Sequence, residues 1–219
     1  MWFNCSSREQ KRLVCAWDFG GLYIKNCKVF NHILENLAIF SQGRNQFFPI
    51  VMRAGRDFKG RLYTWAAAMD SAGIFSTNGK GCGDGKNCYP QYPVRGICPA
   101  GWHLPTEAEY RALFTTVGGK STAGKMLRST RDWNGIVDGT DAFNFAALPA
   151  GSFYVGPSSN WSYLEGIYAG FGTYAHFWSS TPSETYTAYS MGLSGGKENA
   201  DLDDELKDQG FSVRCVKNN

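Results

Sequence analysis

The chain has 219 residues, a length that fits one large domain or one domain with a terminal extension. Apolar residues make up 43% of it and charged residues 19%, an ordinary globular composition that excludes disorder over most of the chain. The formal net charge of +3 is too small to indicate a nucleic-acid partner, and no segment approaches the roughly 20 consecutive apolar residues of a transmembrane helix.

The beginning of the chain is poorly patterned. Residues 1–55 are treated as an N-terminal extension, followed by a domain at residues 56–219. Apolar positions at helical spacing predict one short amphipathic helix over residues 29–40. No signal peptide is recognisable in residues 1–30, since only a short apolar run follows the basic residues there. Because the cysteines indicate export, we expect the N-terminus to be truncated or mis-started.

Seven cysteines bear on the compartment in which the protein folds. Cys82 and Cys88 flank a short polar loop and are close enough to form a local disulfide, and Cys98 with Cys215 is the long-range candidate. Two disulfides indicate an oxidising compartment, whereas reduced structural thiols in a cytosolic protein are the alternative. No CxxC pair occurs, which argues against a zinc ribbon or a thioredoxin-type site.

The first half of the domain contains the helical signals. An alanine-rich apolar block predicts helix over residues 61–69, and glycine, asparagine and proline predict a loop over residues 76–97. Thr106 followed three residues later by Glu109 is a capping box, the signature of a helix N-terminus. A second short helix is expected over residues 123–128. The first half therefore supplies the helices of the predicted fold.

The second half of the domain shows strand signals instead. Short aromatic or apolar runs alternate with glycine, serine and asparagine turns after residue 140, so that helices are followed by an antiparallel set of strands in an α+β fold. The strands are predicted at residues 143–148, 151–155, 174–179, 188–193 and 211–216.

Specific strings of residues then point to a family. The strings are residues 60–69, residues 98–106 with Glu109, and residues 147–151, 177–181 and 210–216. Together, and in this order, they closely resemble the Fibrobacter succinogenes major paralogous domain over residues 60–217. The resemblance implies a disulfide-stapled, C-type-lectin-like α+β fold, with two short helices packed on short antiparallel strands and long loops between them.

The same resemblance has implications for localisation and for one disulfide. Members of that bacterial family are generally exported or surface-attached, so a secreted or cell-surface location is implied. The fold is related in shape to that of formylglycine-generating enzymes. The resemblance also implies that Cys98, just before the first helix, pairs with Cys215 on the last strand.

The predicted binding face comes from two segments. The lectin-like scaffold is similar to the variable proteins of diversity-generating retroelements, in which a stretch ahead of the final strand is diversified. Residues 151–172 and 184–209 are predicted to be exposed loops, rich in tyrosine and small polar residues, a composition typical of adaptable binding surfaces. The predicted ligand-binding residues are Trp161, Tyr163, Tyr168, Tyr174, Tyr186, Tyr189, Asn199, Asp201 and Asp203.

Three motifs that suggest other chemistry are set aside. The acidic run at residues 201–205 fails the spacing of an EF-hand, because Leu206 stands where that loop needs glycine, so a solvated acidic loop is favoured. Residues 192–196 match GxSxG, but no histidine follows them, and a glycine turn is expected. His103 near Cys98 suggests a nucleophile pair, but the resemblance makes Cys98 a disulfide partner.

The function predicted from these observations is that of a non-catalytic exported or cell-surface domain for ligand binding or adhesion. The expected ligand is a glycan or a protein, and no catalytic residue, metal or cofactor is predicted. One alternative is a structural envelope protein without a discrete ligand, and another is a retroelement-diversified variable binding protein. The weakest alternative is an enzyme of the formylglycine-generating type.

Overall fold

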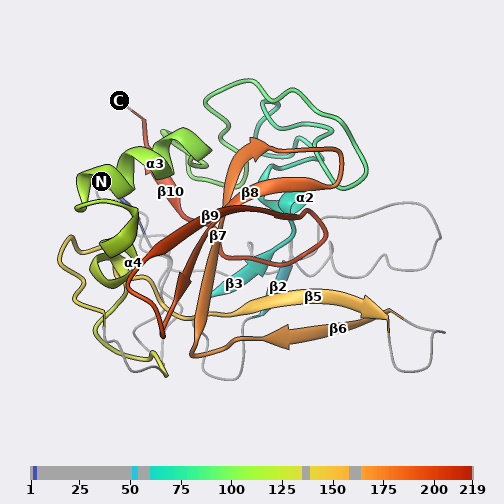
Figure 1. Cartoon of the computed structure of the whole chain (residues 1–219). Coiled ribbons are helices and arrows are strands. Elements are labelled where there is room, and N and C mark those ends of the chain that lie inside the picture. The colour runs from blue at the N-terminus through green and yellow to red at the C-terminus, as the bar shows by residue number, and fades with distance from the viewer. Residues whose placement is uncertain (1, 4–50, 54–59, 135–138, 158–163, 219) are drawn as a thin grey trace, which may run out of the picture.

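The computed structural model describes residues 2–3, 51–53, 60–134, 139–157 and 164–218 of the chain. Within this part the fold is mixed α+β, with short helices and short antiparallel strands, as predicted (Figure 1). The helices are α2 (Trp65–Ala68), α3 (Glu107–Thr116) and α4 (Lys120–Leu127). The strands are β1 (Trp2–Phe3), β2 (Val51–Arg53), β3 (Arg61–Tyr63), β4 (Trp102–His103), β5 (Ser152–Pro157), β6 (Leu164–Ala169), β7 (Tyr174–Pro182), β8 (Thr187–Ser194), β9 (Ala200–Leu206) and β10 (Cys215–Lys217).

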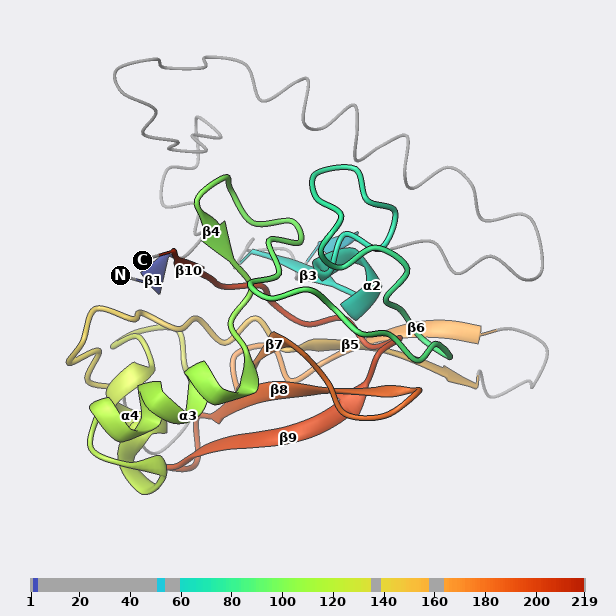
Figure 2. The same cartoon turned by 90° about the horizontal axis from the view of Figure 1, so that it is seen from above.

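The longest strands form a three-stranded antiparallel sheet in the order β7-β8-β9. The register places His176 of β7, Gly192 of β8 and Asp201 of β9 in one row across the sheet. Because successive side chains of a strand point to opposite faces, one face of the sheet presents these residues, and the other presents their neighbours along each strand. The shorter sheets are β1-β10-β4, β2-β3 and the β5-β6 ribbon, and they lie to one side of it in Figure 2.

The face of this sheet opposite to His176, Gly192 and Asp201 packs against α3 and α4, which lie to one side of the strands in Figure 1. Helix α3 begins at the predicted capping box: the Oγ1 atom of Thr106 accepts a hydrogen bond from the Glu109 amide (3.1 Å), and the Glu109 carboxylate accepts one from the Thr106 amide (2.8 Å). The helix then buries apolar residues at helical spacing. The sheet contributes Ala175, Phe177, Met191, Leu193, Ala200 and Leu202 to this core, and α3 contributes Tyr110, Leu113 and Phe114.

A second core covers part of the opposite face of the sheet. Trp178 of β7 packs there with Trp65 of α2 and with Phe211, whose ring centroid lies 4.4 Å from that of Trp178. Each indole nitrogen has a main-chain partner: Trp65 donates to the carbonyl oxygen of Ser179 (2.8 Å) and Trp178 to that of Tyr63 (2.7 Å). Large rings are thus buried with their polar atoms satisfied. The half of this face nearer to Tyr174 is left out of the second core.

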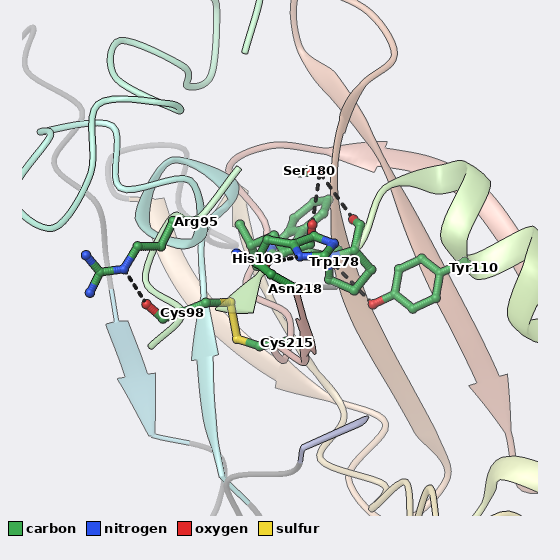
Figure 3. Close-up of a disulfide and its surroundings, with 10 residues drawn as sticks. Arg95, Cys98, His103, Tyr110, Trp178, Ser180, Cys215 and Asn218 are labelled. Atoms are coloured by element: carbon green, nitrogen blue, oxygen red, sulfur yellow. Dashed lines mark hydrogen bonds between the residues drawn. A yellow bond between two sulfur atoms is a disulfide. The ribbon is translucent and has the colours of Figure 1, made fainter. Parts of the chain in front are cut away.

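Both predicted disulfides are present. Cys82–Cys88 closes a short loop, and Cys98–Cys215 joins residues 117 apart in the sequence (Figure 3). Beside the long-range bridge, His103 joins the end of the chain to α3, with its Nδ1 atom 2.7 Å from the side-chain oxygen of Asn218 and its Nε2 atom 2.8 Å from the carboxylate of Glu109. The bridge and this histidine hold β4, β10 and α3 together.

Several local predictions are confirmed and several are wrong. The loop at residues 76–97 and the strands within β5, β7 and β8 are confirmed. Residues 61–69 are a strand followed by a helix, because the Thr64 side chain accepts a hydrogen bond from the Ala67 amide and begins the helix there. Residues 143–148 form turns instead of a strand, with positive φ at Asn144 and Ala146. The helix predicted over residues 29–40 lies outside the described residues.

The two segments predicted as exposed loops are largely strands, which corrects the loop assignment. Residues 151–172 contain β5 and β6, and residues 184–209 contain β8 and β9. The acidic composition of β9 suggested a solvated loop. In the structure the acidic side chains of this strand are exposed or half-buried, whereas Ala200 and Leu202 enter the core. One buried side chain in every second position is sufficient for an edge strand.

We predict that Cys215→Ser lowers the free energy of unfolding by about 4–5 kcal/mol under oxidising conditions, because the bridge closes a long loop in the unfolded chain. Cys88→Ser, which opens a six-residue separation, is the matched control and costs about 2 kcal/mol. Urea unfolding with and without dithiothreitol measures both values. An equal loss for Cys215→Ser in reduced and oxidised protein would contradict the role of the bridge.

Candidate functional site

A hollow of about 110 Å³ opens on the half of the β7-β8-β9 sheet that the second core leaves uncovered. We call it the Gly192 hollow. All three strands contribute to it, so its lining is held by the backbone hydrogen bonds of the sheet. Its lining includes the side chains of Tyr174, His176, Ser190, Lys197, Asp201, Asp203 and Glu205.

The hollow exists because β8 has a glycine at position 192, between its two neighbouring strands. Gly192 pairs with His176 on one side and with Asp201 on the other. A Cβ atom built on Gly192 would lie 3.6 Å from the Cε1 atom of His176 and 3.8 Å from the Cβ atom of Asp201. These are ordinary van der Waals distances, so a side chain here would occupy the hollow without a clash at its Cβ atom. Glycine inside a strand often marks a site where another group approaches the backbone closely.

His176 forms one wall of the hollow. Its ring stacks on Phe211 with the centroids 4.6 Å apart and the planes 22° from parallel. Burial lowers its pKa to about 4, although the charge of Asp201 acts in the opposite direction, so the imidazole is neutral at pH 7. Among the described residues its buried Nδ1 atom has no hydrogen-bond partner. A buried polar atom without a partner is costly, and a ligand that supplied one would be favoured.

The opposite wall is acidic. Asp201 accepts a hydrogen bond from the side-chain amide of Asn199 (2.8 Å) and lies 3.8 Å from the ammonium of Lys120. Asp203 is exposed and Glu205 is half-buried on the same face of β9. Burial raises the pKa of Glu205, and the nearby charges of Asp203 and Asp204 raise it further. The carboxylates therefore form a crowded negative wall.

Tyr174 stands at the end of the hollow where β7 begins. Its side chain is 48% exposed, and its ring centroid lies 6.5 Å from that of His176. A Cβ atom on Gly170 would lie 2.8 Å from the Tyr174 ring, so the glycine lets the ring lie close to the preceding turn. The hollow thus combines two rings, a buried acceptor or donor nitrogen, and carboxylates on a rigid sheet.

The structure brings some of the sequence-predicted binding residues to this hollow. Tyr174, Asp201 and Asp203 line it, and Asn199 holds the Asp201 carboxylate. Tyr189 is half-buried and its register with Asp204 places it on the opposite face, so it does not line the hollow.

The other predicted residues lie elsewhere. Tyr168 of β6 packs edge-on against Phe153 with the centroids 5.0 Å apart. Tyr186 is exposed, and its ring lies beside Gly85, a residue of the loop that Cys82–Cys88 closes. Trp161 and Tyr163 lie outside the described residues.

Ser190, Gly192 and Glu205 line the hollow but were missed from the sequence. Gly192 falls within both the strand predicted at residues 188–193, which is confirmed, and the glycine turn predicted at residues 192–196, of which only Gly195 and Gly196 form a turn. The signal that identifies it is the alternation of small and apolar residues on both sides of the glycine, which is typical of a strand with a gap on one face.

A buried lysine anchors the disulfide loop near Tyr186. The Lys207 side chain is 1% exposed, and its ammonium donates to the carbonyl oxygens of Glu184 (2.7 Å), Thr185 (2.9 Å) and Lys86 (3.3 Å). The same ammonium lies 4.8 Å from the centroid of the Trp65 ring. Burial lowers the pKa of Lys207, and this effect is partly offset by the charge of Asp84. A single cation therefore joins the disulfide loop to the turn before β8.

We predict that Lys207→Met lowers the free energy of unfolding by about 1–3 kcal/mol, because three main-chain oxygens lose their charged donor. Amide hydrogen exchange should accelerate in residues 82–88 and 184–186. Lys86→Met is the matched control, since that lysine is exposed and contributes only its carbonyl oxygen. Equal exchange in both variants would show that the ammonium does not anchor the loop.

We predict a pH effect from His176. Its folded pKa, about 4, is lower than its ordinary value of 6.5, so the unfolded chain binds more protons between these pH values and stability falls as the pH falls. Between pH 7 and pH 4.5 the protein should therefore lose about 2–3 kcal/mol more than His176→Gln does. Tyr174→Phe is the control and keeps the wild-type loss. Urea unfolding at the two pH values measures it, and identical losses in wild type and His176→Gln would refute the assignment.

Comparison with curated proteins and with solved structures finds no match. The model of the Fibrobacter succinogenes major domain matches residues 27–217, which is most of the chain and includes every residue of the Gly192 hollow. The match begins upstream of residue 56, where the sequence pattern placed the start of the domain. The chain therefore belongs to the Fibrobacter succinogenes major domain family.

Proposed function

We propose that this protein is a non-catalytic ligand-binding or adhesion domain, exported or displayed at the cell surface, which holds part of its ligand in the Gly192 hollow. The proposed scaffold is C-type-lectin-like. The observation on which the proposal rests is the buried Nδ1 atom of His176, which has no partner among the described residues and would lie 3.7 Å from a Cβ atom placed on Gly192, beside the hollow. A ligand donor or acceptor placed there would satisfy it.

The stiffness of the surroundings supports binding. The hollow lies on three strands whose other face is packed against α3 and α4. Little side-chain or backbone motion has to be lost when a ligand enters a site that is already ordered, and this preorganisation favours affinity. The Cys98–Cys215 bridge holds β10 to the segment ahead of α3 and so restrains the helix layer behind the sheet.

The arrangement of polar groups supports binding over hydrolysis. Ser190, His176 and Asp201 are the residue types of a nucleophilic triad and lie close together on the sheet. A triad needs hydrogen bonds from the histidine to both partners. The Nδ1 atom of His176 has no such bond, and Asp201 is instead bound to Asn199. The group of residues is better suited to contact a ligand than to activate a serine.

Two further observations support the proposed location. Two disulfides form readily only in an oxidising compartment such as the cell exterior. Among the helices that the structure describes, none is long and apolar enough to cross a membrane.

The size of the hollow, about 110 Å³, suits one side-chain-sized group of a larger glycan or protein.

Glycan and protein arrays probed with the full chain test the proposal. We predict that a ligand found in this way binds Gly192→Val at least tenfold more weakly, because the valine side chain fills the hollow. Valine is also favourable in a strand, so the melting temperature should not fall. Gly196→Ala is the matched control, since a Cβ atom there meets nothing within 4 Å.

The outcome that contradicts the proposal is equally specific. If Gly192→Val and Gly196→Ala both bind the array ligand as tightly as wild type, the hollow is not the binding site. If neither array gives a ligand, a structural role in the cell envelope is the better account.

A further inference from the structure

We infer that the Gly192 hollow binds an organic cation with N–H donors, the ammonium or guanidinium group of a basic side chain on a partner protein. This inference rests on the proposed function and names the class of ligand. It follows from the charge, the hydrogen-bonding capacity and the size of the hollow.

The carboxylates on β9 provide the negative charge. Asp203 and Glu205 stand two positions apart on the same face of the strand, and neither forms an ion pair with any described residue. Their mutual repulsion and the burial of Glu205 both raise the pKa of Glu205. A cation placed between them would relieve the repulsion and supply the missing counter-charge.

His176 does not oppose a cation, because its low pKa keeps the imidazole uncharged at neutral pH. A neutral imidazole has one nitrogen that accepts hydrogen bonds and one that donates them. The Nδ1 atom, which would lie 3.7 Å from a Cβ atom placed on Gly192, is the nitrogen that accepts an N–H from the proposed ammonium or guanidinium group. In this tautomer the proton is on Nε2.

Two lysines lie near the hollow and must be considered. The ammonium of Lys120 is 3.8 Å from Asp201, and Lys197, which is exposed, is one of the residues that line the hollow. Both side chains are long and at least partly exposed, and such surface pairs contribute little to stability. Neither forms an ion pair with Asp203 or Glu205, so the acidic end of the hollow keeps its charge.

Shape and aromatic character agree with a basic side chain. The exposed ring of Tyr174 stands at the end of the hollow away from Glu205, since Tyr174 pairs with Ser194 and Glu205 with Ala188, so it can contact the partner beside the basic side chain but not the cationic head between the carboxylates. A volume of about 110 Å³ holds a guanidinium or ammonium head with its adjoining methylene groups. A neutral sugar would stack on the same ring but would leave the carboxylates without a counter-charge.

The direct test is titration of the full chain followed by two-dimensional NMR of its backbone amides. The probes are agmatine, which has both an ammonium and a guanidinium group, tetramethylammonium, which has charge but no N–H, and neutral 1-butanol. Agmatine is expected to shift the amides of β8 and β9 at least tenfold more strongly than tetramethylammonium does, and 1-butanol is expected to leave them unchanged. Equal shifts with all three probes would overturn the inference.

A second arm separates a free amine from a side chain. The tripeptides N-acetyl-Gly-Arg-Gly-amide and N-acetyl-Gly-Lys-Gly-amide are compared with N-acetyl-Gly-citrulline-Gly-amide, which has nearly the shape of the arginine peptide and no charged group. Tighter binding of the basic peptides than of agmatine assigns the site to a protein side chain. Tighter binding of agmatine would support a cation site but would overturn the assignment of the cation to a side chain of a partner protein. Equal binding of the arginine and citrulline peptides overturns both.

Variants connect the binding to the named residues. Asp203→Asn combined with Glu205→Gln should weaken the binding of agmatine at least tenfold, whereas Asp204→Asn, on the opposite face of β9, should leave it within twofold. Unchanged binding in the double variant overturns the inference. If an array ligand is neutral and Gly192→Val abolishes its binding, the proposed function stands and the inference that the hollow binds a cation is wrong. If neither agmatine nor an array ligand responds to Gly192→Val, both are wrong.

Discussion

The packing of alternate residues of the β7-β8-β9 sheet against α3 and α4 determines which side chains the opposite face of the sheet presents. Phe177, Met191 and Leu202 enter that core, and the two-residue period of the strands then sends His176, Gly192 and Asp201 to the opposite face. A shift of one residue in the register would bury the acidic side chains and expose the apolar ones. The position of the hollow is therefore a consequence of the core behind it.

One end of the second face of the sheet packs in the second core, and the other end carries the proposed binding site. At one end Trp178 and Ala188 pack under Trp65 and Phe211, and the indole nitrogens are bound to main-chain oxygens. At the other end no described element covers the polar side chains, and the imidazole of His176 stands at the boundary with its ring on Phe211. The stacking holds the ring in place and also removes it from water, which accounts for both its low pKa and its unpartnered nitrogen.

The features that sequence predicted correctly depend on short-range rules. Thr106 and Glu109 define a helix N-terminus within four residues, and the Cys82–Cys88 pair needs only a short loop. Strand β9 was missed because its acidic composition outweighed the two inward positions, Ala200 and Leu202, that make it a strand. The hollow itself depends on pairing between three strands, and no property of Gly192 alone reveals which side chains will be its neighbours.

The anchoring of the disulfide loop by Lys207 has a consequence for evolution. Its three partners are carbonyl oxygens of residues 86, 184 and 185, atoms that every amino acid possesses. Mutations that replace the side chains at those positions leave the anchor chemically intact. Divergent members of the family would thus be free to alter the outer surface here while inheriting the same local shape, provided that the lysine is retained.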